Sequence, residues 1–120
     1  MALKDKKFGD TVRDLRKAKG MGLREFAKKV DMSPTYLSKV ERNEFRPPAE
    51  EKVVAIAEAL DQDPDELLGL AGRVPSDLAE IVRSRPREMA AFLRTAKSLT
   101  TQEIEKLTQQ AGRRKKRSKR

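Results

Sequence analysis

The chain contains no cysteine, no histidine and no tryptophan, and only 4% of its 120 residues are aromatic. The missing cysteine excludes disulfides, thiolate zinc sites and cysteine nucleophiles. The missing histidine removes the commonest general base and a common metal ligand. We therefore expect no enzyme, no metal site and no cofactor; two carboxylates paired closely in a cleft would revive the enzymatic interpretation.

Long apolar runs are also missing. No apolar segment approaches the roughly 18 residues that a membrane-spanning helix requires, and the N-terminus lacks the charged-then-apolar pattern of a signal peptide. We expect a soluble, intracellular protein that does not enter a membrane. Because 37% of the residues are hydrophobic, 39% are charged and few are aromatic, the composition favours amphipathic helices and an all-α fold.

The charge is large and unevenly distributed. The formal net charge is +9, which favours an anionic partner. Residues 1–46 hold 13 Lys/Arg against 7 Asp/Glu, whereas residues 47–72 hold 1 against 7. The last eight residues, RRKKRSKR, carry +7, and we expect this segment, residues 113–120, to be a disordered tail. It would act either as a non-specific DNA clamp or only as a solubilising end.

Apolar residues recur at helical spacing in five segments between residues 6 and 71. Gly20 is suited to end the first helix, and Gly72 to end the fifth. Pro47 or Pro48 begins the fourth helix. The expected core residues are Phe8, Val12, Leu15, Leu23, Phe26, Ala27, Val30, Leu37, Val40, Val53, Ile56, Ala57 and Leu60.

The second and third helices are short and are joined by a turn of about three residues, DMS. Ser33 is a good N-cap for the third helix, Pro34 fits its first turn, and Asn43 can close it in a left-handed conformation. Leu37 and Val40 form the buried stripe, which leaves small, hydrogen-bonding and basic residues outside. Such a pair of helices matches the geometry needed to enter the major groove of DNA.

The segment GMGLREFAKKVDMSPTYLSKVERNEFRPPAEEKVVAIAEALDQDPDELL resembles the lambda-repressor-like, Cro-type helix-turn-helix family, also called the xenobiotic-response-element family of bacterial and phage regulators. The resemblance covers about residues 7–71. It implies a five-helix DNA-binding domain over residues 1–72 that binds double-stranded DNA sequence-specifically and regulates transcription. It also implies a location in the bacterial cytoplasm, in association with the nucleoid.

The resemblance also implies roles for single residues. Arg16 and Glu41 correspond to an ion pair that ties the first helix to the third. The positions that read bases are Pro34, Thr35, Tyr36, Ser38 and Lys39. The positions that touch phosphates are Arg24, Ser33, Arg42, Asn43 and Arg46. The chemistry of Lys39 suits a guanine, and that of Thr35 a thymine. Asp31 and Asn43 stand where members often have a glycine, so both are expected to adopt a positive φ.

Residues 73–112 predict three further helices, after Pro75, after Pro86 and from the capping box Thr100–Glu103. Their apolar stripe predicts a homodimer, which would repress transcription at a pseudo-palindromic operator. Two alternatives stay open: the stripe covers the fourth and fifth helices of its own chain, or residues 73–110 bind a partner protein, as in an antitoxin. The expected dimerisation residues are Met89, Phe92, Leu93, Ala96, Leu99, Ile104 and Leu107.

Overall fold

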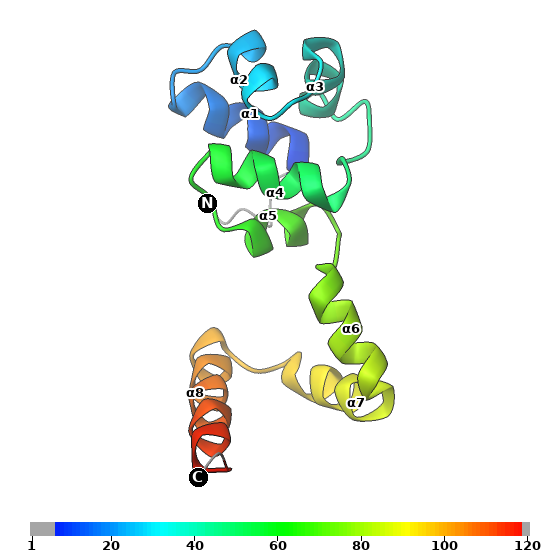
Figure 1. The fold of residues 1–120 in the computed structure, drawn as a ribbon, viewed down its shortest axis with the longest axis vertical. Helices are drawn as coiled ribbons and strands as arrows, with labels where there is room; N and C mark the ends of the chain where they lie inside the picture. Colours follow the sequence, from blue (N-terminus) through cyan, green and yellow to red (C-terminus); the bar gives the residue numbers. More distant parts are fainter. Residues whose placement is uncertain (1–6, 119–120) are drawn as a thin grey trace. The chain divides into compact units, whose positions relative to one another are not determined.

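The computed structural model describes residues 7–118, with side chains up to Lys115. In this range every regular element is an α-helix, which confirms the all-α prediction (Figure 1). The eight helices of this range are α1 (Phe8–Ala18), α2 (Leu23–Lys29), α3 (Pro34–Glu41), α4 (Glu50–Ala59), α5 (Pro64–Leu70), α6 (Ser76–Ser84), α7 (Pro86–Ala96) and α8 (Thr101–Ser118). None of them is long and apolar enough to cross a membrane.

The helices form two compact units that divide between Ser76 and Asp77. We call α1–α5 the N-terminal unit and α6–α8 the C-terminal unit. The division lies four residues beyond the boundary expected after Gly72. The reason is that Arg73 donates hydrogen bonds of 2.7 Å to the carbonyls of Pro47 and Pro48, so the segment after α5 is held against the N-terminal unit.

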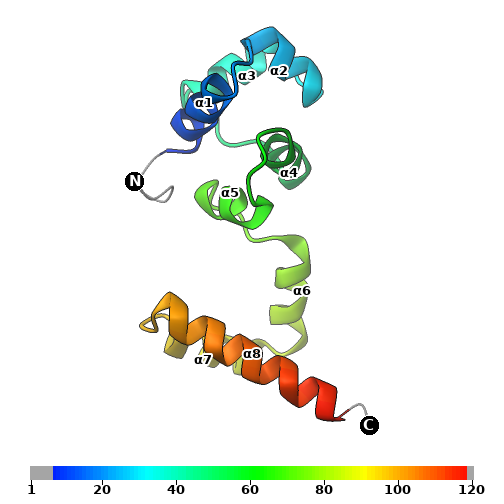
Figure 2. The ribbon, with the colours of Figure 1, turned by 90° about the vertical axis from the view of Figure 1, so that its left-hand side faces the viewer.

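The N-terminal unit encloses one hydrophobic core. Most of the core residues expected from the sequence are buried in it, and Leu15 and Leu23 pack on it partly buried. Figure 2 shows α1, α2 and α3 together at one end of this unit and α4 and α5 at the other. The buried apolar residues are Phe8, Val12, Phe26, Ala27, Val30, Leu37, Val40, Val53, Ile56, Ala57, Leu60, Leu67 and Leu68.

Each helix of the N-terminal unit ends in the same turn, in which a left-handed residue and the residue after it donate their backbone N–H groups to the last helical turn. At the end of α3, Asn43 has a φ of 62° and donates to the Val40 carbonyl at 3.0 Å. Glu44 then donates to the Lys39 carbonyl at 2.9 Å. The left-handed residues are Gly20, Asp31, Asn43, Asp61 and Gly72.

The fourth helix begins later than the sequence predicted. It starts at Glu50 with Ala49 as the N-cap residue, so the prediction that Pro47 or Pro48 begins the helix is wrong by two residues or more. The two prolines instead precede the helix in a loop, where their carbonyls are the acceptors for Arg73.

The C-terminal unit has little internal core. Neither α6 nor α7 contains a buried residue, although both are amphipathic. The capping box of α8 is formed as predicted: the Glu103 N–H donates to the Thr100 hydroxyl at 3.1 Å, and the Thr100 N–H donates to the Glu103 carboxylate at 2.8 Å.

Helix α8 continues through Ser118, so the expectation that residues 113–120 are disordered is wrong for residues 113–118. Residues 119 and 120 lie outside the described residues. Lys and Arg are good helix formers, and cations near a helix C-terminus are stabilised by the helix dipole. Once the capping box has started the helix, these two effects outweigh the repulsion between like charges.

Candidate nucleic-acid interface

Helix α3 packs on α1 and α2 through one face only. Leu37, Val40 and Glu41 are buried on this face, with exposed fractions of 3% or less. On the opposite side, Pro34 and Thr35 are exposed, and Tyr36, Ser38 and Lys39 are half-buried. The N-terminus of α3 is capped by Ser33, whose hydroxyl accepts the Tyr36 N–H at 3.1 Å. The five residues that are exposed or half-buried here are those expected to read bases, and we call them the outer face of α3. Tyr36 also packs, partly buried, against the hydrophobic core.

A buried ion pair fixes α3 against α1. The Arg16 guanidinium donates to both carboxylate oxygens of Glu41, at 2.7 and 2.9 Å, and its third donor reaches the Met21 carbonyl at 2.9 Å. The hydrogen bond to Glu41 raises the pKa of Arg16 above its ordinary value, against the opposing effect of burial. This bidentate geometry fixes the orientation of α3 relative to α1.

The end of α3 is held by a second link to α1, which the sequence did not reveal. The Asn43 side chain accepts the Gly9 N–H at 3.0 Å and donates to the Asp10 carboxylate at 2.9 Å. Gly9 is required there, because a methyl group on it would lie 2.2 Å from the Val40 carbonyl oxygen. Asn43 was expected to touch phosphate; its amide already makes two bonds within the domain, so that contact stays a prediction.

A shallow groove of about 290 Å³ runs between α2 and α3. Three residues expected to read bases, Pro34, Thr35 and Ser38, line it together with two expected to bind phosphate, Arg24 and Arg42. Leu23 also lines it. The Arg42 guanidinium forms an exposed ion pair of 3.1 Å with Glu44, and Arg46 is exposed in the loop that follows α3.

Phe45, which the sequence reasoning did not single out, lies against α3. Its ring centroid is 5.7 Å from that of Tyr36, with the ring planes tilted by 43°. The Lys39 ammonium lies 5.2 Å from the same centroid, which is within the range of a cation–π interaction. An apolar residue in a polar loop after the third helix was the available signal.

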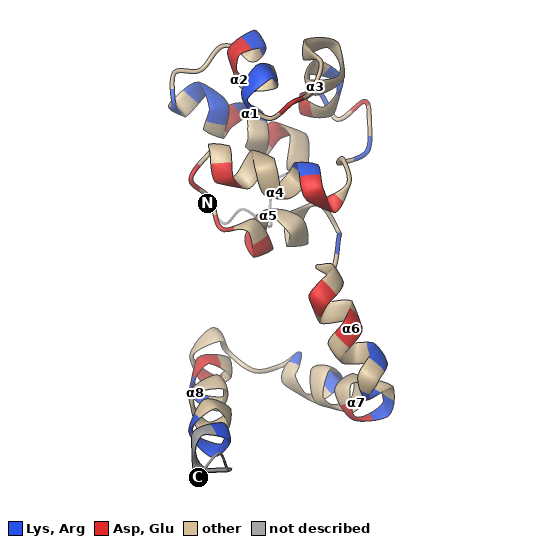
Figure 3. Cartoon of the chain, viewed as in Figure 1, with Lys and Arg blue, Asp and Glu red and all other residues tan. Residues whose placement is uncertain are grey.

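The charges of the N-terminal unit are segregated. Figure 3 shows most of its Lys and Arg on α1–α3 and on the loop after α3, whereas α4 and α5 carry mostly Asp and Glu. The end of the unit that contains α3 is therefore the one suited to a polyanion. In the described part of the chain, no cluster of three or more His, Cys, Asp or Glu side chains is placed to hold a metal ion.

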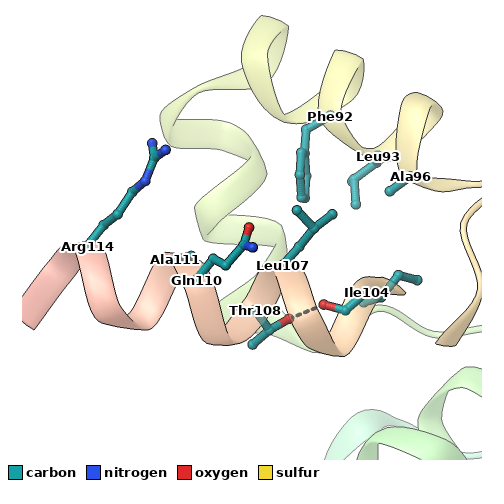
Figure 4. A pocket seen from close by; sticks show the side chains of 9 residues that line it. All are labelled: Phe92, Leu93, Ala96, Ile104, Leu107, Thr108, Gln110, Ala111 and Arg114. Atoms are coloured by element: carbon teal, nitrogen blue, oxygen red, sulfur yellow. Dashed lines mark hydrogen bonds between the residues drawn. The ribbon is translucent and has the colours of Figure 1, made fainter. Parts of the chain in front are cut away.

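The C-terminal unit contains an apolar groove of about 600 Å³ between α7 and α8. Phe92, Leu93 and Ala96 line it from α7, and Ile104 and Leu107 line it from α8. Figure 4 shows the Leu107 side chain pointing toward Phe92 and Leu93. The structure thus brings together five of the seven residues expected to form a dimer; Met89 and Leu99 are half-buried outside this groove.

The chain is similar to a known protein family and to solved structures. A family model described as helix-turn-helix matches residues 12–67. No curated protein sequence matches the chain. One similar solved structure, described as the master regulator for biofilm formation SinR in complex with DNA, is 33% identical and covers 51% of this chain and 97% of that chain, with a TM-score of 0.48. Another, of a SinR protein/SinI protein complex, is 23% identical and covers 91% and 98%, with a TM-score of 0.50.

The family match contains α2, α3 and the turn between them. The likeness to the second structure, at 23% identity, shows the same fold over 91% of this chain. Residues 12–67 therefore form a helix-turn-helix domain, the kind of domain found in DNA-binding transcriptional regulators.

Proposed function

We propose that the protein is a sequence-specific repressor that binds double-stranded DNA through the outer face of α3 and acts as a homodimer. The observation that carries this proposal is the asymmetry of α3. Its core face buries Leu37, Val40 and Glu41, while Pro34 and Thr35 remain exposed at its N-terminal end. The major groove is about 12 Å wide and accepts one helix.

The residues of the outer face have distinct roles in this proposal. Lys39 donates to guanine O6 or N7, and Thr35 offers a hydroxyl and a methyl group to a thymine. Arg24 and Arg42 line the groove between α2 and α3, where each can reach the phosphate backbone. Arg46 extends the same basic surface along the loop.

The homodimer is supported by the groove between α7 and α8. Phe92 and Leu93 are each 54% exposed, and Ile104 and Leu107 are 45% and 42% exposed. Contiguous apolar surface of this kind marks an interaction site. A second copy of the unit would cover it and place two copies of α3 about 34 Å apart, one turn of DNA, on a pseudo-palindromic operator. Binding there would repress transcription by occluding a promoter.

Selection of bound fragments from a random DNA pool, combined with a size measurement of the free protein, tests the proposal. We expect enrichment of a two-fold symmetric sequence and a mass twice the 13.6 kDa of one chain. A pool that stays random after selection would remove the sequence-specific function, and a mass of one chain would remove the dimer.

Two lysines provide a matched test of the reading face. Lys39→Ala should lower the preference for the selected duplex over random DNA, by about five- to tenfold for a single-donor base contact. Lys29→Ala removes the same charge on α2 beside Glu58 and Asp61, away from the outer face of α3, and should leave the preference unchanged. Equal losses from both variants would show that α3 does not read bases.

The basic end of α8 offers a second test. Truncation after Gly112 removes +7 and should lower affinity for all DNA sequences alike, because phosphate contacts act by counterion release. The slope of log affinity against log salt concentration should also become flatter. An unchanged slope would leave the segment a solubilising end.

A second function is favoured by the same groove between α7 and α8: a regulator whose C-terminal unit binds a partner protein. SinR is found in a complex with SinI, and the likeness to that complex extends beyond the helix-turn-helix domain. Two observations together would favour this function over the homodimer. The free protein would be a monomer, and a partner protein would copurify with it only when residues 77–112 are present.

A further inference from the structure

The turn at the end of α3 brings the loop back onto the side of the helix. Asn43 adopts the left-handed conformation, and the Glu44 and Phe45 N–H groups both donate to the Lys39 carbonyl, at 2.9 and 3.4 Å. The backbone of Phe45 is thereby tied to the residue whose side chain its ring contacts. The end of α3 therefore fixes the backbone from which the Phe45 ring projects.

The ring of Phe45 connects two residues of the outer face of α3. Tyr36 and Lys39 are three residues apart, so they are neighbours on one side of the helix. The Phe45 centroid lies 5.7 Å from the Tyr36 centroid and 5.2 Å from the Lys39 ammonium. Yet 44% of Phe45 is exposed, which makes it one of the large apolar residues that the core does not cover.

The contact with a ring keeps the charge of Lys39 available. Within the described residues no carboxylate lies within ion-pair distance of the Lys39 ammonium, and the neighbouring Glu44 pairs with Arg42 instead. A carboxylate partner would have to be displaced before the ammonium met a base. An aromatic face restricts the long, flexible side chain without neutralising it.

We propose that Phe45 is a positioning residue: its ring holds the Lys39 ammonium in the orientation from which it donates to a base edge, and so increases discrimination at one base pair. This inference rests on the proposed function, because it requires α3 to read bases. Pre-organisation lowers the entropy lost when a flexible side chain is immobilised on binding. A cation–π contact at an exposed site corresponds to an effect of about two- to fivefold in an equilibrium constant.

The experiment uses the full chain and the tightest-binding duplex recovered from a random pool, together with its single base-pair variants and random duplex DNA. Phe45→Leu keeps an apolar side chain but removes the aromatic face; it should reduce discrimination at one base pair about two- to fivefold. The pair affected should be the one whose discrimination falls in Lys39→Ala. Affinity for random DNA should not change.

Two controls separate positioning from a structural role. Phe45→Trp retains an aromatic face and should preserve discrimination, while thermal unfolding of all variants should coincide. In a Lys39→Ala background, Phe45→Leu should have no further effect on discrimination, because the side chain that it positions is gone.

The outcomes distinguish this inference from the proposed function. If Lys39→Ala changes base preference but Phe45→Leu does not, or if the two effects are additive, the positioning role is overturned and base reading by α3 stands. An equal loss on random DNA in Phe45→Leu would make Phe45 a backbone contact and overturn the inference. If no duplex is enriched over random DNA, the proposed function fails, and the inference fails with it.

Discussion

The N-terminal unit buries its large apolar side chains within one chain, whereas the C-terminal unit leaves its own exposed. Phe26, Leu37 and Ile56 are completely buried. In contrast, α6 and α7 contain no buried residue, and Phe92 is 54% exposed. The helices of the C-terminal unit are also amphipathic. The difference therefore lies in how many helices share a core. The five helices of the N-terminal unit enclose a hydrophobic core, whereas α6, α7 and the described side chains of α8 do not.

The comparison assigns different tasks to the two units. In the first, the buried hydrophobic core supplies the stability, so the exposed residues on the outer face of α3 are not needed for folding and can serve to bind a ligand. In the second, the exposed apolar surface is the one for which we propose association with another chain, because burial of apolar area is favourable. Variants in the first unit should change unfolding, and variants in the second should change assembly.

The largest expected effect is on the N-terminal unit. Glu41→Ala leaves the Arg16 guanidinium buried without its partner and should lower the free energy of unfolding by about 3–5 kcal/mol. Denaturant unfolding followed by circular dichroism measures the change. Glu44→Ala breaks only an exposed ion pair with Arg42 and should cost less than about 1 kcal/mol. Similar losses in both variants would mean that the buried pair does not hold α3 in place.

The next effect concerns the C-terminal unit. Phe92→Ser removes a groove-lining side chain whose burial contributes about 1.5–3 kcal/mol, so it should weaken self-association roughly ten- to a hundredfold. Sedimentation at several concentrations measures it. Leu78→Ser removes an apolar side chain on α6 that is 44% exposed and lies outside the groove, and should leave association unchanged. If Leu78→Ser were the more disruptive variant, the dimer surface would lie elsewhere.

A glycine pair tests the contact between α1 and α3. Gly9→Ala places a methyl group 2.2 Å from the Val40 carbonyl oxygen and should destabilise the N-terminal unit by about 1–3 kcal/mol. Gly69→Ala, in the last turn of α5, meets no atom within 4 Å and should stabilise it by up to about 1 kcal/mol. Thermal unfolding distinguishes the two. Opposite signs are the expected outcome, and a shared sign would contradict the close approach of the two helices.

The smallest effect is a surface ion pair. A hydrogen bond from the Lys19 ammonium lowers the pKa of Asp61 below its ordinary value. The pair therefore adds stability at neutral pH that is lost as the pH falls below about 4, where the carboxylate becomes protonated. Asp61→Asn keeps a side chain that tolerates the left-handed φ of 56°. It should be slightly less stable than the parent at pH 7 in thermal unfolding, and the difference should shrink as the pH falls through the lowered pKa and as salt is added.

Local structure was largely predictable from the sequence because its signals are local. Ser33 caps α3 and Thr100 caps α8, and Gly20 and Asn43 adopt the left-handed conformation expected at helix ends. These features depend on a few neighbouring residues and on no distant contact. The sequence did not reveal that Pro47 and Pro48 lie in a loop before α4, where their carbonyls accept hydrogen bonds from Arg73, a residue 25 positions beyond Pro48.

The candidate site was predictable only in part for the same reason. The spacing of Leu37 and Val40 identified the outer face of α3, and with it Thr35 and Lys39. Periodicity cannot show that Asn43 bonds to α1 or that Phe45 folds back onto Lys39. Both contacts are made by residues that follow α3, and they form because the turn after the helix directs the chain back toward α1 and α3.

By itself, the sequence determined which segments are helical, where most of them end and which face of each is apolar, because caps, left-handed turns and hydrophobic periodicity act over one or two helical turns. Only the tertiary structure decided how each polar side chain is used. Arg16 and Asn43 are committed to internal contacts, while Thr35 is left at the surface. The physical reason is that burial and hydrogen bonding of a side chain depend on which helices meet around it, and those helices come from distant parts of the chain.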